Sequence, residues 1–127
     1  MAYKNRKYNG VMTLTTVPAD VVTTLDTSVI GANKVFSVDV LISVMGLASI
    51  YEGSVIARYI TLYYTDAIGN VFLVDPTTIV YFLGDANGTQ TWTYSEVING
   101  SNNIEITVDS TTIASTRCIF DITVEYY

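Results

Sequence analysis

The stretch KVFSVDVLISVM, residues 34–45, decides the fold class because its apolar side chains recur with a period of two. Apolar residues occupy every second position from Phe36 to Val44, and polar residues such as Asp39 stand between them. Successive side chains of a β-strand point to opposite faces of the sheet. The stretch therefore predicts a strand with one buried face and one face in water.

Two further segments repeat this alternation, NNIEITVD (residues 102–109) and RCIFDITVEYY (residues 117–127). Runs rich in Val, Ile, Thr and Tyr are also typical of strands. They add strand candidates at residues 11–16, 20–25, 54–65, 71–75, 78–83 and 91–97. Turn signals that contain Gly or Asn fall between the runs, at residues 31–33, 68–70, 87–88 and 99–100.

The absence of a helical pattern completes the assignment of fold class. No stretch of twelve residues carries a helical apolar stripe, and for residues 45–53 we expect a loop with one helical turn. A chain of 127 residues fits one domain. We therefore expect a single antiparallel β-sandwich over residues 11–127, jelly-roll or immunoglobulin-like, preceded by a short extended N-terminal arm over residues 1–10.

The charge of the chain is divided unequally between the arm and the sandwich. The arm holds Lys4, Arg6 and Lys7 and no acid, so its side chains carry a charge of +3. The other three cations stand against all twelve acids, which gives residues 11–127 a net charge of −9. An acidic body repels a polyanion, and three cations release few counterions, so nucleic acid is disfavoured as a partner.

Aromatic side chains are interleaved with the cations of the arm. The partner-binding candidates are Tyr3, Lys4, Arg6, Lys7 and Tyr8. Our hypothesis is that the arm docks on a neighbouring protein, with the tyrosines supplying buried area, since exposed ion pairs contribute only about 0–1 kcal/mol each. The alternative is a solvated, frayed terminus.

Two strand candidates are apolar on both faces, VFLV (residues 71–74) and IVYFL (residues 79–83). Leu41 and Ile119 likewise stand among the polar positions of their strands. The outer face of an antiparallel sandwich normally alternates to polar. Either loops cover these strands or they form a subunit interface, and the low charge content favours the interface. We therefore expect self-association.

The residue types available for catalysis are few. The chain has no histidine, the commonest general base and metal ligand. Cys118 alternates inward and is interpreted as a core residue, as are Trp92 and Phe120. No phosphate loop, Rossmann glycine pattern or nucleophile elbow occurs. Asp85 and Asn87 could offer oxygens to calcium, but a turn is favoured. The sequence predicts no enzyme, cofactor or metal site.

No apolar run approaches the roughly 20 residues of a membrane-spanning helix. No apolar stretch of signal-peptide length follows the cations of the arm. We expect a soluble chain that is not exported by itself and has no membrane partner.

The second half of the chain, TWTYSEVINGSNNIEITVDSTTIASTRCIFDITVEYY, resembles a small β-sandwich module of tailed-bacteriophage virion proteins, found in fibres and in head or tail accessory subunits. A Trp-bearing strand is followed by a Gly/Asn turn, an N-x-I-x-I-x-V strand, a small polar turn and an alternating last strand. LTTVPADVVTTLDTSVIGANKVFSVDVLISVMG, residues 14–46, is similar to the opening of that module. The resemblance spans about residues 12–126.

The resemblance implies a structural role in a virion that assembles in the host cytoplasm. We expect a capsid decoration or head-fibre anchoring protein that contacts the major capsid protein or neighbouring copies, as a homo-oligomer with a trimer favoured. The alternative is a receptor- or glycan-binding module of a tail fibre or baseplate, with a sugar platform drawn from the aromatic residues. Candidates for the platform are Tyr63, Tyr64, Trp92 and Tyr94.

Overall fold

The computed structural model describes residues 4–12, 19–45, 55–84, 92–110 and 117–126, and within them it contains strands and turns and no helix. The strands are β1 (Lys4–Met12), β2 (Ala19–Leu25), β3 (Val35–Met45), β4 (Val55–Thr65), β5 (Val71–Gly84), β6 (Trp92–Ile98), β7 (Ile104–Ser110) and β8 (Arg117–Tyr126). The predictions for residues 46–53 and for Asp85 and Asn87 lie outside the described residues.

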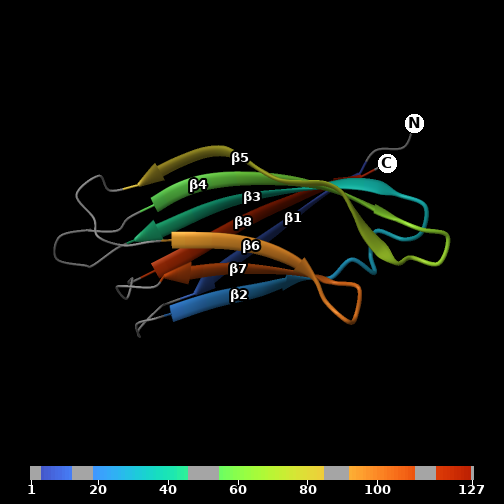
Figure 1. Ribbon diagram of the computed structural model, residues 1–127, viewed down its shortest axis with the longest axis horizontal. Helices are drawn as coiled ribbons and strands as arrows, with labels where there is room; N and C mark the ends of the chain where they lie inside the picture. The colour runs from blue at the N-terminus through green and yellow to red at the C-terminus, as the bar shows by residue number, and fades with distance from the viewer. Residues whose placement is uncertain (1–3, 13–18, 46–54, 85–91, 111–116, 127) are drawn as a thin grey trace.

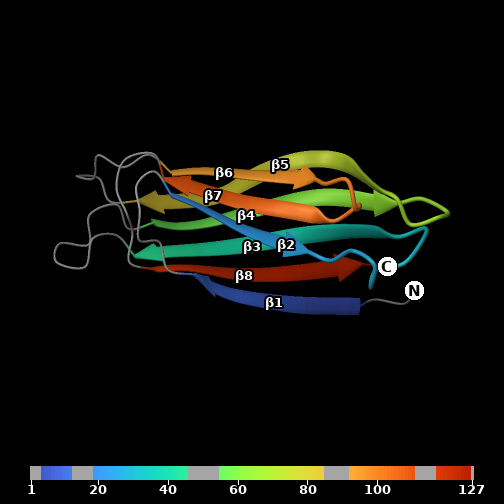
Figure 2. The ribbon, with the colours of Figure 1, turned by 90° about the horizontal axis from the view of Figure 1, so that it is seen from below.

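The strands form two antiparallel sheets. One sheet has the order β1-β8-β3-β4-β5, and the other has the order β2-β7-β6. Figures 1 and 2 show the two sheets layered against each other with their strands along the long axis of the molecule. The expected antiparallel β-sandwich is therefore confirmed.

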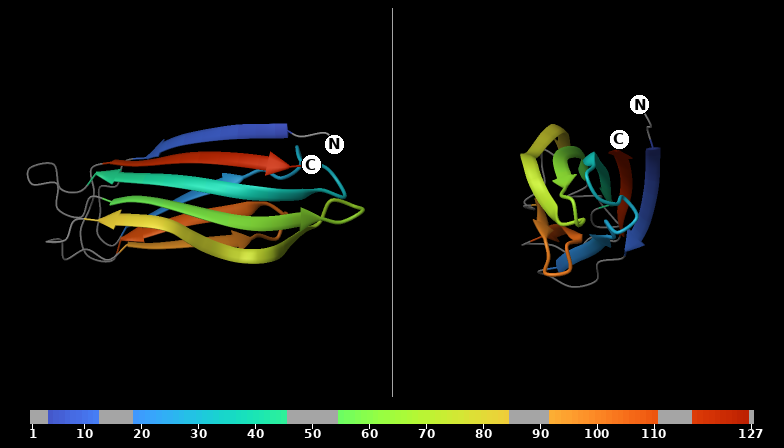
Figure 3. Two further views of the ribbon diagram at one scale, coloured as in Figure 1. Left: turned by 90° about the horizontal axis from the view of Figure 1, so that it is seen from above. Right: turned by 90° about the vertical axis from the view of Figure 1, so that its right-hand side faces the viewer.

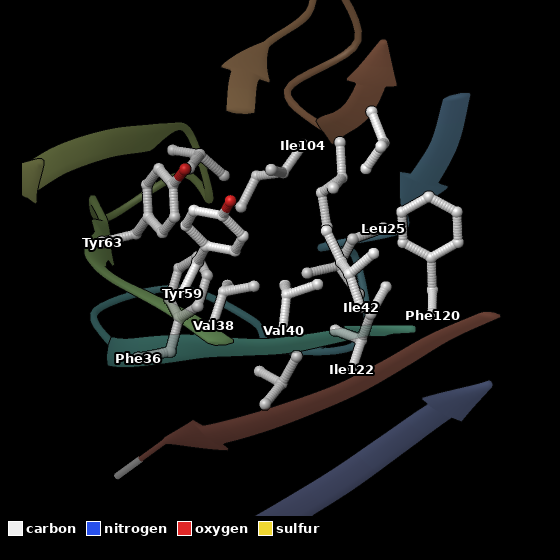
Figure 4. Packing of buried hydrophobic residues seen from close by; sticks show 14 of the residues in the cluster. Leu25, Phe36, Val38, Val40, Ile42, Tyr59, Tyr63, Ile104, Phe120 and Ile122 are labelled. Atoms are coloured by element: carbon white, nitrogen blue, oxygen red, sulfur yellow. The ribbon is translucent and has the colours of Figure 1, made fainter. Parts of the chain in front are cut away.

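The core lies between the sheets and follows the predicted alternation. Every second residue of β3 from Phe36 to Ile42 is buried, as is every second residue of β8 from Phe120 to Tyr126. Ile104, Ile106 and Val108 of β7 face them from the other sheet. Figure 4 shows several of these side chains converging between the layers. Phe120 is 0% exposed, as predicted, whereas the side chain of Trp92 is outside the description.

The segment that the sequence assigned to an arm lies along one edge of the larger sheet. β1 pairs antiparallel with β8, from Lys4 opposite Tyr126 to Met12 opposite Cys118. The strand runs without a break across the boundary that we drew at residue 10. It follows that the start of β1 and the end of β8 lie side by side, and Figure 2 shows the two strands as neighbours.

β5 forms the opposite edge and differs from the sequence prediction. The two predicted runs, 71–75 and 78–83, form one strand of 14 residues that continues through Pro76. Its pairing with β4 shifts register between Arg58 and Tyr59 and again between Ile60 and Tyr63. An edge strand tolerates proline and irregular pairing because only one of its sides needs a complete hydrogen-bond ladder.

Candidate functional site

The inner face of β5 is not covered by the second sheet. Leu73 pairs with Tyr63, and Phe82 pairs with Ala57. Directly paired residues of an antiparallel ladder point to the same face. Tyr63 and Ala57 are buried, whereas Leu73 is 50% exposed and Phe82 is 45% exposed. The smaller sheet therefore covers β4 but leaves most of β5 in water, at the edge seen in the end-on view of Figure 3.

The outer face of β5 is apolar as well. Phe72 stacks on Tyr64 with ring centroids 5.1 Å apart, and Leu83, which is 64% exposed, pairs with Ile56. We call the exposed apolar side chains of this strand, with Ile56 and Tyr64 of β4, the β5 surface. From β5 it contains Phe72, Leu73, Val74, Ile79, Val80, Tyr81, Phe82 and Leu83. These strand residues are exposed, so the alternative in which loops bury them is wrong.

The other residues flagged by the apolar pattern behave differently. Leu41 of β3 and Ile119 of β8 are half-buried, because both strands lie inside the larger sheet with a neighbour on each side. They do not belong to the β5 surface. Among the residues that the apolar pattern singled out, those of β5 therefore form the candidate subunit interface, and Leu41 and Ile119 do not.

A carboxylate lies on the inward face of β6 and joins the two sheets. Glu96 accepts hydrogen bonds from the hydroxyl of Tyr63 at 2.7 Å and from that of Thr61 at 3.0 Å. The hydroxyl of Tyr94 also donates to Glu96. The hydroxyl oxygens of Thr61 and Thr77 are 2.7 Å apart, which extends the cluster to β5. Burial raises the pKa of Tyr94 and of Tyr63, and the charge of Glu96 raises both further. A groove of about 430 Å³ opens beside this cluster, but the oxygens of Glu96 already accept three hydroxyl donors.

Sequence reasoning missed the role of Glu96. The signal was present, because Glu96 stands between Tyr94 and Ile98 in the same alternating set of β6. An acid at a position that alternation places inward needs hydrogen-bond partners there. Two of its three donors, Thr61 and Tyr63, come from β4, more than thirty residues away, and no local pattern identifies them.

The tyrosines proposed as a sugar platform do not form one. Tyr63 is buried and stacks on Phe36, with ring centroids 5.4 Å apart. Tyr94 stacks on Tyr59, with centroids 3.8 Å apart and an interplanar angle of 5°. Tyr64 is exposed but stacks on a side chain of the β5 surface. The rings of Tyr63 and Tyr94 serve the core, and a flat aromatic platform is absent from the part of these strands that the structure describes.

Three turns at one end of the sandwich share the same construction. Each begins with an Asp or Asn whose side-chain oxygen accepts the backbone N–H two residues later: Asp26 from Ser28, Asp66 from Ile68 and Asn99 from Ser101. The same oxygens of Asp66 and Asn99 also accept the N–H four residues later. These turns lie at the right-hand end of Figure 1.

Hydrogen bonds between the turns hold them together. The amide of Asn102 donates to Asn70 at 3.0 Å, and the hydroxyl of Thr27 donates to the backbone oxygen of Asn102 at 2.6 Å. The side-chain oxygen of Asn103 accepts the N–H of Thr27 at 3.2 Å. Gly69 has φ of +90° and Asn102 has φ of +59°, as tight turns require. Between the turns lies a polar groove of about 430 Å³, which we call the turn groove.

Neither a metal centre nor a membrane helix is found in the part of the chain that the structure describes. No group of three or more His, Cys, Asp or Glu residues there could hold a metal ion. No helix there is long and apolar enough to cross a membrane.

On the outer face of β4, Arg58 forms a bidentate ion pair with Asp39 of β3. The hydrogen bonds to that carboxylate raise the pKa of Arg58.

The arm candidates fall on β1 or before it. Lys4, Arg6, Lys7 and Tyr8 lie on β1, opposite Tyr126, Val124, Thr123 and Ile122 of β8, while Tyr3 precedes the described residues. The strand brings four candidates to one sheet edge. Their binding role stays a prediction.

The sequence matches no protein-family model and no curated protein. In structure, the chain is similar to the tailspike protein of Acinetobacter baumannii phage AM24, at 11% identity and a TM-score of 0.47, over 98% of this chain and 26% of the tailspike. It is also similar to the tailspike protein of Acinetobacter phage vB_ApiP_P1, at 16% identity and a TM-score of 0.44, over 95% of this chain and 21% of the tailspike. The chain thus spans about a quarter of the length of these tailspikes.

Proposed function

We propose that the chain is a non-enzymatic structural module of a bacteriophage virion and that copies of it assemble through the β5 surface. The sequence resemblance supports the virion role. The observation that carries the mode of action is that β5 exposes apolar side chains on both of its faces. Monomeric proteins rarely expose contiguous apolar patches larger than a few hundred Å².

A second copy of the chain is the occupant that fits this surface. Asp75 is the only charged residue of β5, so another apolar surface can pack on the strand without burying an array of charges. Two copies of the chain repel each other, because each has a net charge of −6. Contact through β5 limits this repulsion, since most of the carboxylates then lie outside the interface. Pro76 interrupts the free edge, so the copies pack through side-chain faces and not through continuous strand pairing.

The resemblance favours a trimer. Three copies around a threefold axis can each turn one face of β5 inward. A dimer formed through the same side chains would satisfy the apolar surface equally well, so the mass of the assembly decides between them.

Size-exclusion chromatography with light scattering tests the assembly. The wild-type chain should elute as an oligomer at micromolar concentration, and the double variant Ile79→Lys/Leu83→Lys should elute as a folded monomer, because both side chains are at least 60% exposed. The matched control is Val22→Lys on β2, where the side chain is 46% exposed and lies on the other sheet. A wild-type monomer, or an oligomer that survives the double substitution, would refute assembly through β5.

The position of the module on the particle is a separate question. The sequence favoured capsid decoration or head-fibre anchoring over a tail fibre or baseplate. We propose the tail position, because the turn groove is a ligand-sized polar site that a recognition module needs and a decoration subunit does not. Mass spectrometry of purified virions, followed by gold-labelled antibody, tests both statements. Absence from virions would refute the virion role, and labelling of the head would favour the original assignment.

A further inference from the structure

The turn groove is lined without charge. Its walls come from residues 27–32, 67–70 and 101–103, and none of the lining side chains is acidic or basic. Asp26 and Asp66 precede lining residues in the chain but do not line the groove themselves, and their carboxylates accept N–H donors of their own turns. Hydrogen bonds from Ser28 lower the pKa of Asp26. Desolvation acts to raise the pKa of Asp66, but the hydrogen bonds from Asn70 and Ile68 outweigh it and lower that pKa. A groove with this lining offers no counter-charge to a phosphate and no carboxylate oxygen to a divalent cation.

The groove is lined by residues that offer hydrogen-bonding groups of both kinds. The amide nitrogen of Asn102 donates to Asn70, which leaves the side-chain oxygen of Asn102 as an acceptor. The side-chain oxygen of Asn103 accepts the N–H of Thr27, which leaves its NH₂ group as a donor without a partner among the described residues. An amide donor and an amide acceptor on two consecutive lining residues suit a ligand that carries several hydroxyl groups, because each hydroxyl both donates and accepts.

Apolar groups adjoin these amides. Ala32, Ala67 and Ile68 line the same groove, and Ile68 is 82% exposed. A ring that carries hydroxyl groups at its edge and C–H groups on its face needs this combination of polar and apolar contacts. The groove volume of about 430 Å³ lies within the range of small-molecule sites.

The walls are already held in position. Hydrogen bonds within the turns and between them fix all three segments before any ligand arrives. A preformed site avoids the entropic cost of ordering loops on binding. From the neutral lining, the paired amides, the apolar contacts and the fixed walls, we propose that the turn groove binds a neutral carbohydrate. This inference deepens the recognition role proposed above and is independent of assembly through β5.

An array of neutral and acidic oligosaccharides, probed with the untagged full chain, provides the first test. We expect binding to neutral glycans and not to uronic-acid or sialylated ones. A ¹⁵N-edited NMR titration with the neutral glycan that binds best should shift amide signals of residues 27–32, 67–70 and 101–103. Binding only to acidic glycans, no binding at millimolar concentration, or shifts confined to other parts of the chain would each overturn the proposal.

Three variants connect the binding to the groove. Ala67→Trp fills the groove and should weaken binding by about tenfold or more, whereas Val97→Trp on β6, where the side chain is 56% exposed and does not line the groove, should bind as the wild type does. Asn103→Asp keeps the acceptor for Thr27 but removes the NH₂ donor, and it should weaken binding severalfold. Unchanged affinity in Ala67→Trp, with a folded NMR spectrum, would contradict the assignment. Loss of glycan binding leaves the oligomer mass unchanged, so failure here is distinguishable from failure of the assembly proposal.

Discussion

β4 and β5 are neighbours in one sheet, both rich in apolar residues, yet they differ in burial. From Val55 to Thr65, alternate residues of β4 are buried beneath the second sheet, whereas β5 is exposed at nearly every position after Val71. The two strands differ in burial because the three-stranded sheet packs over β4 and ends before it reaches β5, at the edge of the five-stranded sheet. Apolar content alone therefore does not predict burial. A strand that is apolar on both faces at the edge of a two-layer sandwich needs a further partner to bury it.

The largest expected effect tests this contrast with two phenylalanines. Phe120→Ala removes a fully buried side chain and should lower the free energy of unfolding by about 3–5 kcal/mol. Phe82→Ala on β5 should change it by no more than about 0.5 kcal/mol at concentrations where the chain is monomeric. Denaturant titration of both variants measures the difference. Equal losses would show that β5 is covered within a single copy.

The second prediction concerns the carboxylate that joins the covered part of the larger sheet to the smaller one. Glu96→Ala leaves the hydroxyls of Tyr63, Tyr94 and Thr61 without their acceptor and should cost about 1–3 kcal/mol. Glu105→Ala is the control, because its weaker contact to Asn99 is 3.4 Å long. The same denaturant titration reports both. If Glu105→Ala lowered the stability as much as Glu96→Ala, the hydrogen bonds to Glu96 would not be a special source of stability.

The third prediction concerns alkaline pH. The folded state raises the pKa of Tyr63 and of Tyr94 above the ordinary value, so it holds their protons more tightly than the unfolded state does. The resulting stability is fully present below about pH 10 and declines as the pH rises further. Denaturation midpoints measured between about pH 8 and about pH 11.5 should fall less steeply with pH in Tyr63→Phe/Tyr94→Phe than in the wild type. Identical pH profiles would argue against this linkage.

The smallest effect is expected on the outer face of β4. Arg58→Met breaks the bidentate pair with Asp39, but the guanidinium is exposed and water already screens the charges. The change in unfolding midpoint should lie close to the error of the measurement and vanish at high salt. A large loss that persists in high salt would show that the outer face contributes more than its exposure indicates.

The sequence predicts most reliably where alternation is regular. The inward faces of β3, β7 and β8 follow directly from the period of two, and Phe120 is buried as predicted. β5 was divided at Pro76 because proline usually ends a strand, and only its place at a sheet edge removes that objection. β1 is polar and has no apolar alternation, so its pairing with β8 depends on long-range contact.

The candidate sites divide in the same way. The β5 surface was visible as two apolar runs, since an excess of apolar residues is a local signal. The turn groove was not predicted, because it forms where three turns far apart in the sequence meet. Residues 99–100 marked the last turn in the sequence, and the residue of that turn with positive φ is Asn102. Asn102 is also the residue whose side chain donates to Asn70 of the neighbouring turn.

The pairing of Lys4 with Tyr126 makes the sandwich a candidate for circular permutation. A short linker between the ends of β1 and β8 would cost little loop entropy, because the strands are already neighbours in the ladder. New termini could then be opened in the turn of residues 66–70. Such a permutant would keep the strand order of both sheets and the β5 surface while cutting one wall of the turn groove. The permutant should therefore fold and assemble as the wild type does but lose recognition through the turn groove, although it keeps every residue of the chain.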